Sequence, residues 1–173
     1  LADEMGLGKS VQLIALLLSR YHNESSGMPT AQGMDAGNAV NSESAVTGHI
    51  TFDSEDGGPH PSLIVCPASL VYNWGAEFAK FAPSFNAVVV AGTKAERRTA
   101  IGRAFRADEP TVLITSYDLL RRDVDDYTAN EQRFNVMALD EAQYIKNHTT
   151  KIAKAVKAVA AGHRFALTGT PIE

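Results

Sequence analysis

The sequence opens with LADEMGLGKS, residues Leu1 to Ser10. Gly6 and Gly8 precede Lys9 and Ser10, and apolar residues then recur at helical spacing over residues 9–20. Glycines let backbone N–H groups approach phosphate oxygens, and a helix start adds the positive end of its dipole. We therefore predict a phosphate-binding P-loop in which Lys9 reaches the outer phosphates and Ser10 ligates Mg²⁺. The alternative is a glycine-rich turn with a solvated lysine.

Beyond residue 61, short apolar runs alternate with helical patterns. The runs predict strands over 63–66, 86–90, 112–115, 134–139 and 165–167, and helices over 69–81, 94–107, 117–122 and 149–161. Repeated βα units with continuously apolar strands predict an α/β fold, with a parallel sheet covered by helices on both faces. Ligands of such sheets bind at the carboxyl ends of the strands, where the candidate motifs fall.

Residues 21–61 differ in composition from the rest of the chain. This segment contains no lysine or arginine, and its acidic residues are Glu24, Asp35, Glu43, Asp53, Glu55 and Asp56. A segment with so little apolar surface predicts a flexible acidic insertion. A tolerated surface insertion is the favoured interpretation, because long loops add little closure entropy, and a regulatory loop is the alternative.

The overall composition excludes some classes of protein. The net charge is −4, so a nucleic-acid partner would be held by a local patch rather than by global attraction. The single cysteine, Cys66, indicates a reducing, cytoplasmic setting, and no apolar run is long enough to span a membrane. Because Leu1 leads directly into one motif and Glu173 follows another, we expect a segment of a longer protein.

Two further motifs follow predicted strands. In VMALDEAQ, residues 136–143, an apolar run leads into Asp140 and Glu141. Asp140 suits a magnesium ligand and Glu141 suits a base that polarises water, although an acidic helix start is the alternative. In LTGTP, residues 167–171, small hydroxyl residues surround a glycine. Such a loop can sense a γ-phosphate, and a simple Thr-Gly turn is the alternative.

These motifs, in this order, resemble those of the Swi/Snf-type ATPases of helicase superfamily two. Residues 3–10 resemble motif I, in which that family commonly has an aspartate at the position of Asp3. The segments similar to the remaining motifs are 63–70 with Asn73, Trp74 and 77–83 for motif Ia, 114–118 for motif Ib, 140–147 for motif II and 167–171 for motif III. The resemblance covers nearly the whole chain outside residues 21–61.

The resemblance implies a RecA-like P-loop NTPase lobe over residues 1–173, the first of two lobes and truncated at both ends. It implies ATP and Mg²⁺ as cofactors, with Lys9, Asp140 and Glu141 as catalytic residues and Ser10 and Asp140 as magnesium ligands. The implied nucleotide-binding residues are Asp3, Glu4, Met5, Gly6, Leu7, Gly8, Lys9, Ser10 and Gln12. The implied coupling residues are Thr168, Gly169 and Thr170.

Duplex DNA is the partner that the resemblance implies, together with a second lobe that supplies arginines to the transferring phosphate. The implied DNA contacts are Pro67, Ala68, Ser69, Ser116, Tyr117, Lys146 and Asn147. We expect an ATPase that translocates on duplex DNA and remodels protein–DNA complexes, in the cytoplasm, nucleoid or nucleus. The isolated chain should bind ATP weakly and hydrolyse it negligibly.

Other interpretations remain open. A strand-separating DNA or RNA helicase and a non-catalytic nucleotide-binding module fit much of the same pattern. Trp74 is expected to pack in the core, since its helix also carries Phe78 and Phe81. The basic residues of 94–107 are expected to form a solvated face rather than a track for DNA phosphates. Those residues are Lys94, Arg97, Arg98, Arg103 and Arg106.

Overall fold

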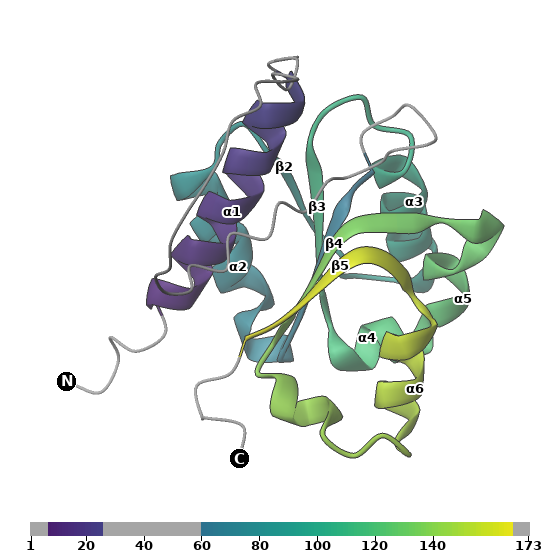
Figure 1. Ribbon diagram of the computed structural model, residues 1–173. Coiled ribbons are helices and arrows are strands. Elements are labelled where there is room, and N and C mark those ends of the chain that lie inside the picture. Colours follow the sequence, from purple (N-terminus) through teal and green to yellow (C-terminus); the bar gives the residue numbers. More distant parts are fainter. Residues whose placement is uncertain (1–6, 26–59, 168–173) are drawn as a thin grey trace, which may run out of the picture.

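The computed structural model describes residues 7–25 and 60–167. Its strands are β1 (Ser62–Cys66), β2 (Asn86–Val89), β3 (Thr111–Ser116), β4 (Arg133–Asp140) and β5 (Ala160–Leu167). Its helices are α1 (Leu7–Ser25), α2 (Val71–Phe81), α3 (Lys94–Ala104), α4 (Tyr117–Arg122), α5 (Val124–Tyr127) and α6 (Lys151–Ala158), with short 3-10 turns η1 (Ala68–Leu70), η2 (Ala129–Glu131) and η3 (Ala142–Ile145). The strands form one parallel sheet in the order β2-β3-β1-β4-β5 (Figure 1).

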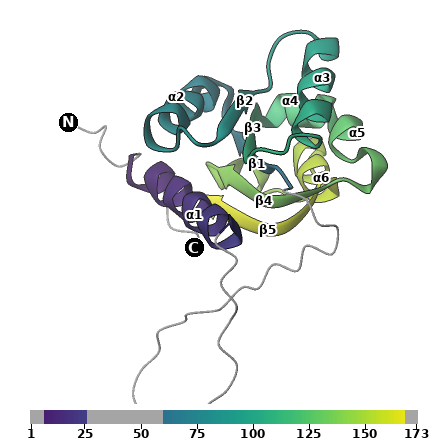
Figure 2. The ribbon, with the colours of Figure 1, turned by 90° about the horizontal axis from the view of Figure 1, so that it is seen from above.

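Helices cover both faces of this sheet, as the sequence pattern predicts. Figure 2 shows α1 and α2 on one side, and α3, α4, α5 and α6 on the other. The central strand β1 is fully buried, and its residues alternate between the two cores. Leu63 and Val65 pack among the residues of α3–α6, whereas Ile64 and Cys66 pack with those of α1 and α2. A strand buried on both faces explains the continuous apolar run.

The first helix extends further than the sequence pattern predicted. Helix α1 continues to Ser25, so residues 21–25 belong to the helix rather than to the expected insertion. The Tyr21 ring packs edge-on against Phe85, with a centroid distance of 5.9 Å, which favours an added helical turn. Residues 26–59, which make up most of that expected insertion, lie outside the described residues.

The predicted helix over 149–161 is wrong at its end. Helix α6 stops at Ala158, Val159 is extended, and β5 begins at Ala160. Pairing with β4, from Arg133 opposite Ala160 to Asp140 opposite Leu167, overrides the helix propensity of the alanines. The Arg164 guanidinium donates hydrogen bonds to the carbonyl oxygens of Val156 and Val159 and so satisfies the end of α6.

Within residues 7–25 and 60–167, no helix is both long enough and apolar enough to cross a bilayer. In Figure 1 the first turn of α1 lies toward the same end of the molecule as the carboxyl ends of β4 and β5. The predicted P-loop helix and the predicted magnesium carboxylate are therefore brought to the same end of the sheet.

Candidate active site

Asp140 ends β4 and is held by groups from separate parts of the chain. Its Oδ1 accepts a hydrogen bond of 3.0 Å from the backbone N–H of Glu141, and its Oδ2 accepts one of 2.9 Å from the indole N–H of Trp74. Its carbonyl oxygen accepts a hydrogen bond of 2.8 Å from the Tyr117 hydroxyl. Both carboxylate oxygens of Asp140 therefore have a fixed orientation.

Glu141 has a backbone conformation that is rare for a residue with a side chain. Its φ of 51° and ψ of 52° place it in the left-handed region. Such strain persists where the surrounding structure holds it, and it is concentrated at functional sites. The Glu141 Oε2 accepts a hydrogen bond of 2.5 Å from the side-chain amide of Gln143. The two neighbouring carboxylates thus have different partners, as two different chemical roles would require.

An aromatic stack lies beside Asp140. The rings of Tyr117 and Tyr144 are stacked, with centroids 5.3 Å apart and an interplanar angle of 6°. Tyr117 is buried, and burial, with the nearby charge of Asp140, raises the pKa of its hydroxyl. That hydroxyl remains a proton donor to the Asp140 carbonyl. Tyr144 keeps 52% of its surface exposed, so the stack extends from the partly buried site to the molecular surface.

The predicted P-loop is described only from Leu7 onward, which is where α1 begins. Lys9 and Ser10 are half-buried in the first turn, whereas Gly8 and Gln12 are exposed. Among the described residues, a Cβ at Gly8 would meet no atom within 4 Å, so none of them crowds this backbone. Asp3, Glu4, Met5 and Gly6, like the predicted coupling residues Thr168, Gly169 and Thr170, lie outside the described residues.

The donor set fits a magnesium ion. Mg²⁺ prefers oxygen ligands and keeps several waters, and Ser10 and Asp140 offer a hydroxyl and a carboxylate. A carboxylate has about four lone-pair positions, and the two hydrogen bonds to Asp140 leave about two of them free. The carboxylate can therefore accept a metal-bound water without losing the partners that orient it.

Two predicted DNA contacts are buried. Ser116 is 4% exposed and its hydroxyl accepts from the Leu119 N–H as the cap of α4, and Tyr117 is 3% exposed. Neither side chain reaches the surface, so contact of these two residues with a DNA backbone stays a prediction that depends on their backbone atoms. Both residues instead fix the segment that joins β3 to α4.

The remaining predicted DNA contacts are more accessible. Ala68 and Ser69 are exposed in η1, and Pro67 before them is half-buried. Lys146 is exposed after η3. Asn147 is exposed too, but its Oδ1 already accepts hydrogen bonds from the backbone N–H and hydroxyl of Thr149. Lys146 is thus the cationic member of this group, and Asn147 shapes the turn that presents it.

Cys66 lies at the end of β1 and is fully buried. Burial, with a smaller effect from the negative charge of Asp140, raises the pKa of its thiol to about 12. A thiol in this state is a poor nucleophile at neutral pH. Cys66 is therefore a packing residue of the site.

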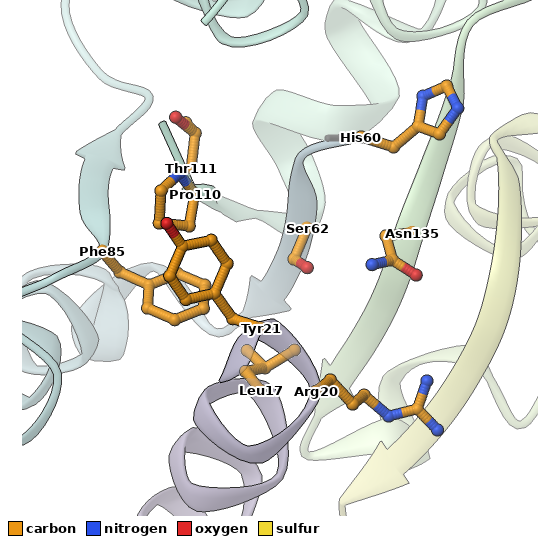
Figure 3. Close-up of a pocket in the computed structure, with 9 residues that line it drawn as sticks. All are labelled: Leu17, Arg20, Tyr21, His60, Ser62, Phe85, Pro110, Thr111 and Asn135. Atoms are coloured by element: carbon orange, nitrogen blue, oxygen red, sulfur yellow. The ribbon is translucent and has the colours of Figure 1, made fainter. Parts of the chain in front are cut away.

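A small pocket lies at the opposite end of the sheet (Figure 3). It is lined in part by Ser62 and Thr111, the first residues of β1 and β3, and by Arg20 and Tyr21 of α1. Its volume of about 30 Å³ suits water rather than a nucleotide. This pocket is accordingly separate from the site around Asp140.

Trp74 lies in the core as predicted, at 3% exposure, and its hydrogen bond to Asp140 was not predicted. A signal was present, because a buried indole N–H needs an acceptor and the carboxylate of Asp140 directly follows a predicted strand. The Gln143–Glu141 bond and the Tyr117–Tyr144 stack were missed as well. Both depend on the turn at Glu141, which no sequence pattern revealed.

Comparison with known proteins identifies the class of this fold and site. The chain belongs to the SNF2-related domain family, whose sequence model matches residues 1–173. The predicted resemblance to Swi/Snf-type ATPases is thereby confirmed.

Particular relatives cover the whole chain. It is 36% identical over 173 residues to the TATA-binding protein-associated factor MOT1 of Saccharomyces cerevisiae, spanning 100% of this chain and 8% of that protein. It is 39% identical over 173 residues to an uncharacterized ATP-dependent helicase of Mycoplasma pneumoniae, spanning 100% of this chain and 13% of that protein. The chain thus spans a small part of the curated relatives it matches.

A solved structure is similar as well. The Sulfolobus solfataricus SWI2/SNF2 ATPase core in complex with dsDNA matches with a TM-score of 0.54 and 37% identity, covering 68% of this chain and 23% of that one. This match confirms the predicted α/β class and the parallel sheet with helices.

Proposed function

We propose that this chain is the ATP-binding lobe of a DNA-dependent ATPase that moves along duplex DNA and remodels protein–DNA complexes. The observation that carries the proposal is the turn at the end of β4, where a fixed Asp140 precedes a left-handed Glu141. Family membership supports the use of ATP, and the similarity to an ATPase core solved with dsDNA supports duplex DNA as the partner.

The residues divide the chemistry among them. Lys9, in the first turn of α1, would hold the outer phosphates of ATP, and Ser10 and Asp140 would hold Mg²⁺. Magnesium supplies charge neutralisation to the phosphates when it is bound. Glu141 accepts a proton from, or orients, the attacking water, while Gln143 limits the positions that its carboxylate can take.

A second lobe completes the site in this proposal, with residues 1–173 forming most of the first. The chain covers only 23% of the similar ATPase core, which leaves ample length for such a lobe in a protein of that kind. An arginine that stabilises the transferring phosphate is worth about 10³-fold or more in rate. The isolated chain should therefore hydrolyse ATP negligibly, and an isolated chain as fast as the full-length protein would contradict this.

Duplex DNA would lie against the exposed part of motif Ia, at Ala68 and Ser69, and near Lys146. Small or polar contacts of this kind position a backbone without reading its sequence. A motor that works on any sequence requires this property. The predicted nucleotide-binding residues before Leu7 and the coupling residues Thr168, Gly169 and Thr170 belong to the same proposal.

A strand-separating helicase is the second candidate, favoured by the similarity to a Mycoplasma pneumoniae protein named as an ATP-dependent helicase. The experiment measures ATP hydrolysis by the full-length protein with duplex DNA, single-stranded DNA and RNA, beside a strand-displacement assay. The proposal predicts strong stimulation by duplex DNA and no displacement. Stimulation by single strands alone, with displacement, would favour the helicase.

A further inference from the structure

Trp74 makes a contact that core packing alone does not require. Its side chain is 3% exposed and packs against Phe78, with ring centroids 6.4 Å apart. Its indole N–H donates to Oδ2 of Asp140, 66 positions away in the sequence, at 2.9 Å. A buried indole needs an acceptor, but any carbonyl would serve. Here the acceptor is the carboxylate proposed to hold magnesium.

We infer that Trp74 is a positioning residue for Asp140 in magnesium binding. This inference rests on the proposed function, because it assumes that Asp140 is the magnesium carboxylate. The backbone N–H of Glu141 fixes Oδ1, and the indole N–H of Trp74 fixes Oδ2, so together they set the plane of the carboxylate. Without the indole donor, Oδ2 loses its hydrogen bond and the carboxylate can rotate about its Cβ–Cγ bond.

The position of Trp74 also ties this orientation to the proposed DNA-binding segment. Trp74 lies in the first turn of α2, directly after the exposed turn η1. Gly75 lets α2 approach β2, since a Cβ there would lie 3.2 Å from Val89 Cγ2. The Trp74 indole itself packs in the core beside Phe78 and donates its N–H to the Asp140 carboxylate. Groups that orient a metal ligand in this way contribute about 10–100-fold to metal affinity or activity.

The test removes the donor while it keeps the ring. Trp74→Phe keeps an aromatic side chain without an N–H. Site-specific replacement of Trp74 by benzothienylalanine keeps the indole shape and exchanges only the N–H for sulfur, so a folding defect of the first variant does not end the test. Tyr72→Phe is the matched control, because Tyr72 lies in the same helical turn and is 69% exposed. Circular dichroism checks that each variant is folded.

The first measurement needs no ATP hydrolysis. Trp74 is the single tryptophan of the chain, so it gives one indole N–H signal in an NMR spectrum of this chain. The inference predicts that this signal moves in Asp140→Ala and also when millimolar Mg²⁺ is added to the native sequence. A signal that responds to neither change overturns the inference, even if the full-length protein proves inactive and the proposed function fails.

The second measurement uses the full-length protein. The Mg²⁺ concentration for half-maximal ATP hydrolysis should rise about 10-fold or more in both Trp74 replacements, while kcat at saturating Mg²⁺ stays within about twofold. Tyr72→Phe should change neither value. A replacement that leaves the Mg²⁺ requirement unchanged, or lowers kcat alone, overturns the inference while the proposed function stands.

Discussion

The guanidinium of Arg97 and the carboxylate of Asp123 form a buried, bidentate ion pair. Arg97 Nε lies 2.5 Å from Oδ2 and Nη2 lies 2.9 Å from Oδ1, and the two residues are 8% and 2% exposed. Arg97 also donates to the carbonyl oxygen of Gly92 at 2.6 Å. The pair, whose hydrogen bonds raise the pKa of Arg97, joins α3 to the junction of α4 and α5. The expectation that Arg97 is solvated is therefore wrong.

Arg97→Ala should lower the free energy of unfolding by about 3 kcal/mol, because it leaves the Asp123 carboxylate buried without its cation. Arg98→Ala is the matched control: its side chain is 77% exposed and lies 3.4 Å from Asp126. That change should stay within about 0.5 kcal/mol. Urea denaturation measures the free energy of unfolding of both variants. An equal loss in Arg97→Ala and Arg98→Ala would show that the buried pair adds no stability.

Gly92 should resist replacement. It has a φ of 88°, and a Cβ there would lie 2.5 Å from Glu96 Oε2, within the capping box that starts α3. Gly92→Ala should lower the free energy of unfolding by about 1 kcal/mol or more. Gly102→Ala, inside the same helix, should raise it by about 0.5–1 kcal/mol, since the new methyl meets only the flexible end of Arg106. The midpoint temperature of thermal unfolding should fall in Gly92→Ala and rise in Gly102→Ala. A shift in the same direction in both variants would contradict the strain at Gly92.

The strain at Glu141 can be measured with a pair of variants. Because φ is 51° there, Glu141→Gly should be more stable than Glu141→Ala by about 0.5–1 kcal/mol. The order should reverse at Lys154, an exposed residue inside α6, where alanine is favoured over glycine by about 1 kcal/mol. Urea denaturation of the four variants tests this, and the same order at both positions would argue against stored strain.

His163 should make stability depend on pH. Burial, followed by the positive charges of Arg20 and Arg133, lowers the pKa of its imidazole in the folded chain. The unfolded chain binds the proton near pH 6.5, so stability is complete above about that pH and falls as the pH drops through the lowered value. His163→Gln should therefore lose less stability than the native sequence between about pH 7.5 and 5.5. Equal losses of stability in His163→Gln and in the native sequence over this pH range would contradict the prediction.

The strand pattern and the order of motifs were enough to predict the class of fold. Continuous apolar runs such as 63–66, alternating with helical patterns, suit strands buried on both faces of a parallel sheet, and the observed sheet has that arrangement. The boundaries that failed depend on tertiary pairing. The predicted helix included Val159 to Ala161 because the segment is rich in alanine. In the structure, Ala160 and Ala161 form a strand because they pair with β4.

The residues of the candidate site could be predicted from the sequence, but the contacts between them could not. Asp140 and Glu141 stood out because two carboxylates follow an apolar run. The donor to Asp140 from Trp74 lies 66 positions away, and no local pattern encodes such a pairing. The burial of Ser116 was equally hidden, because a serine after a strand suits both a surface contact and the cap of the next helix.

Glu141 is proposed to activate the water for ATP hydrolysis that duplex DNA stimulates. The most direct measurement compares hydrolysis by the full-length protein and its Glu141→Gln variant, with and without duplex DNA, while ATP binding is measured in parallel. We expect strong stimulation of the native protein by duplex DNA, and a loss of hydrolysis of about 10²-fold or more in the variant while ATP binding is kept. A variant as active as the native protein, or native hydrolysis indifferent to duplex DNA, would contradict it.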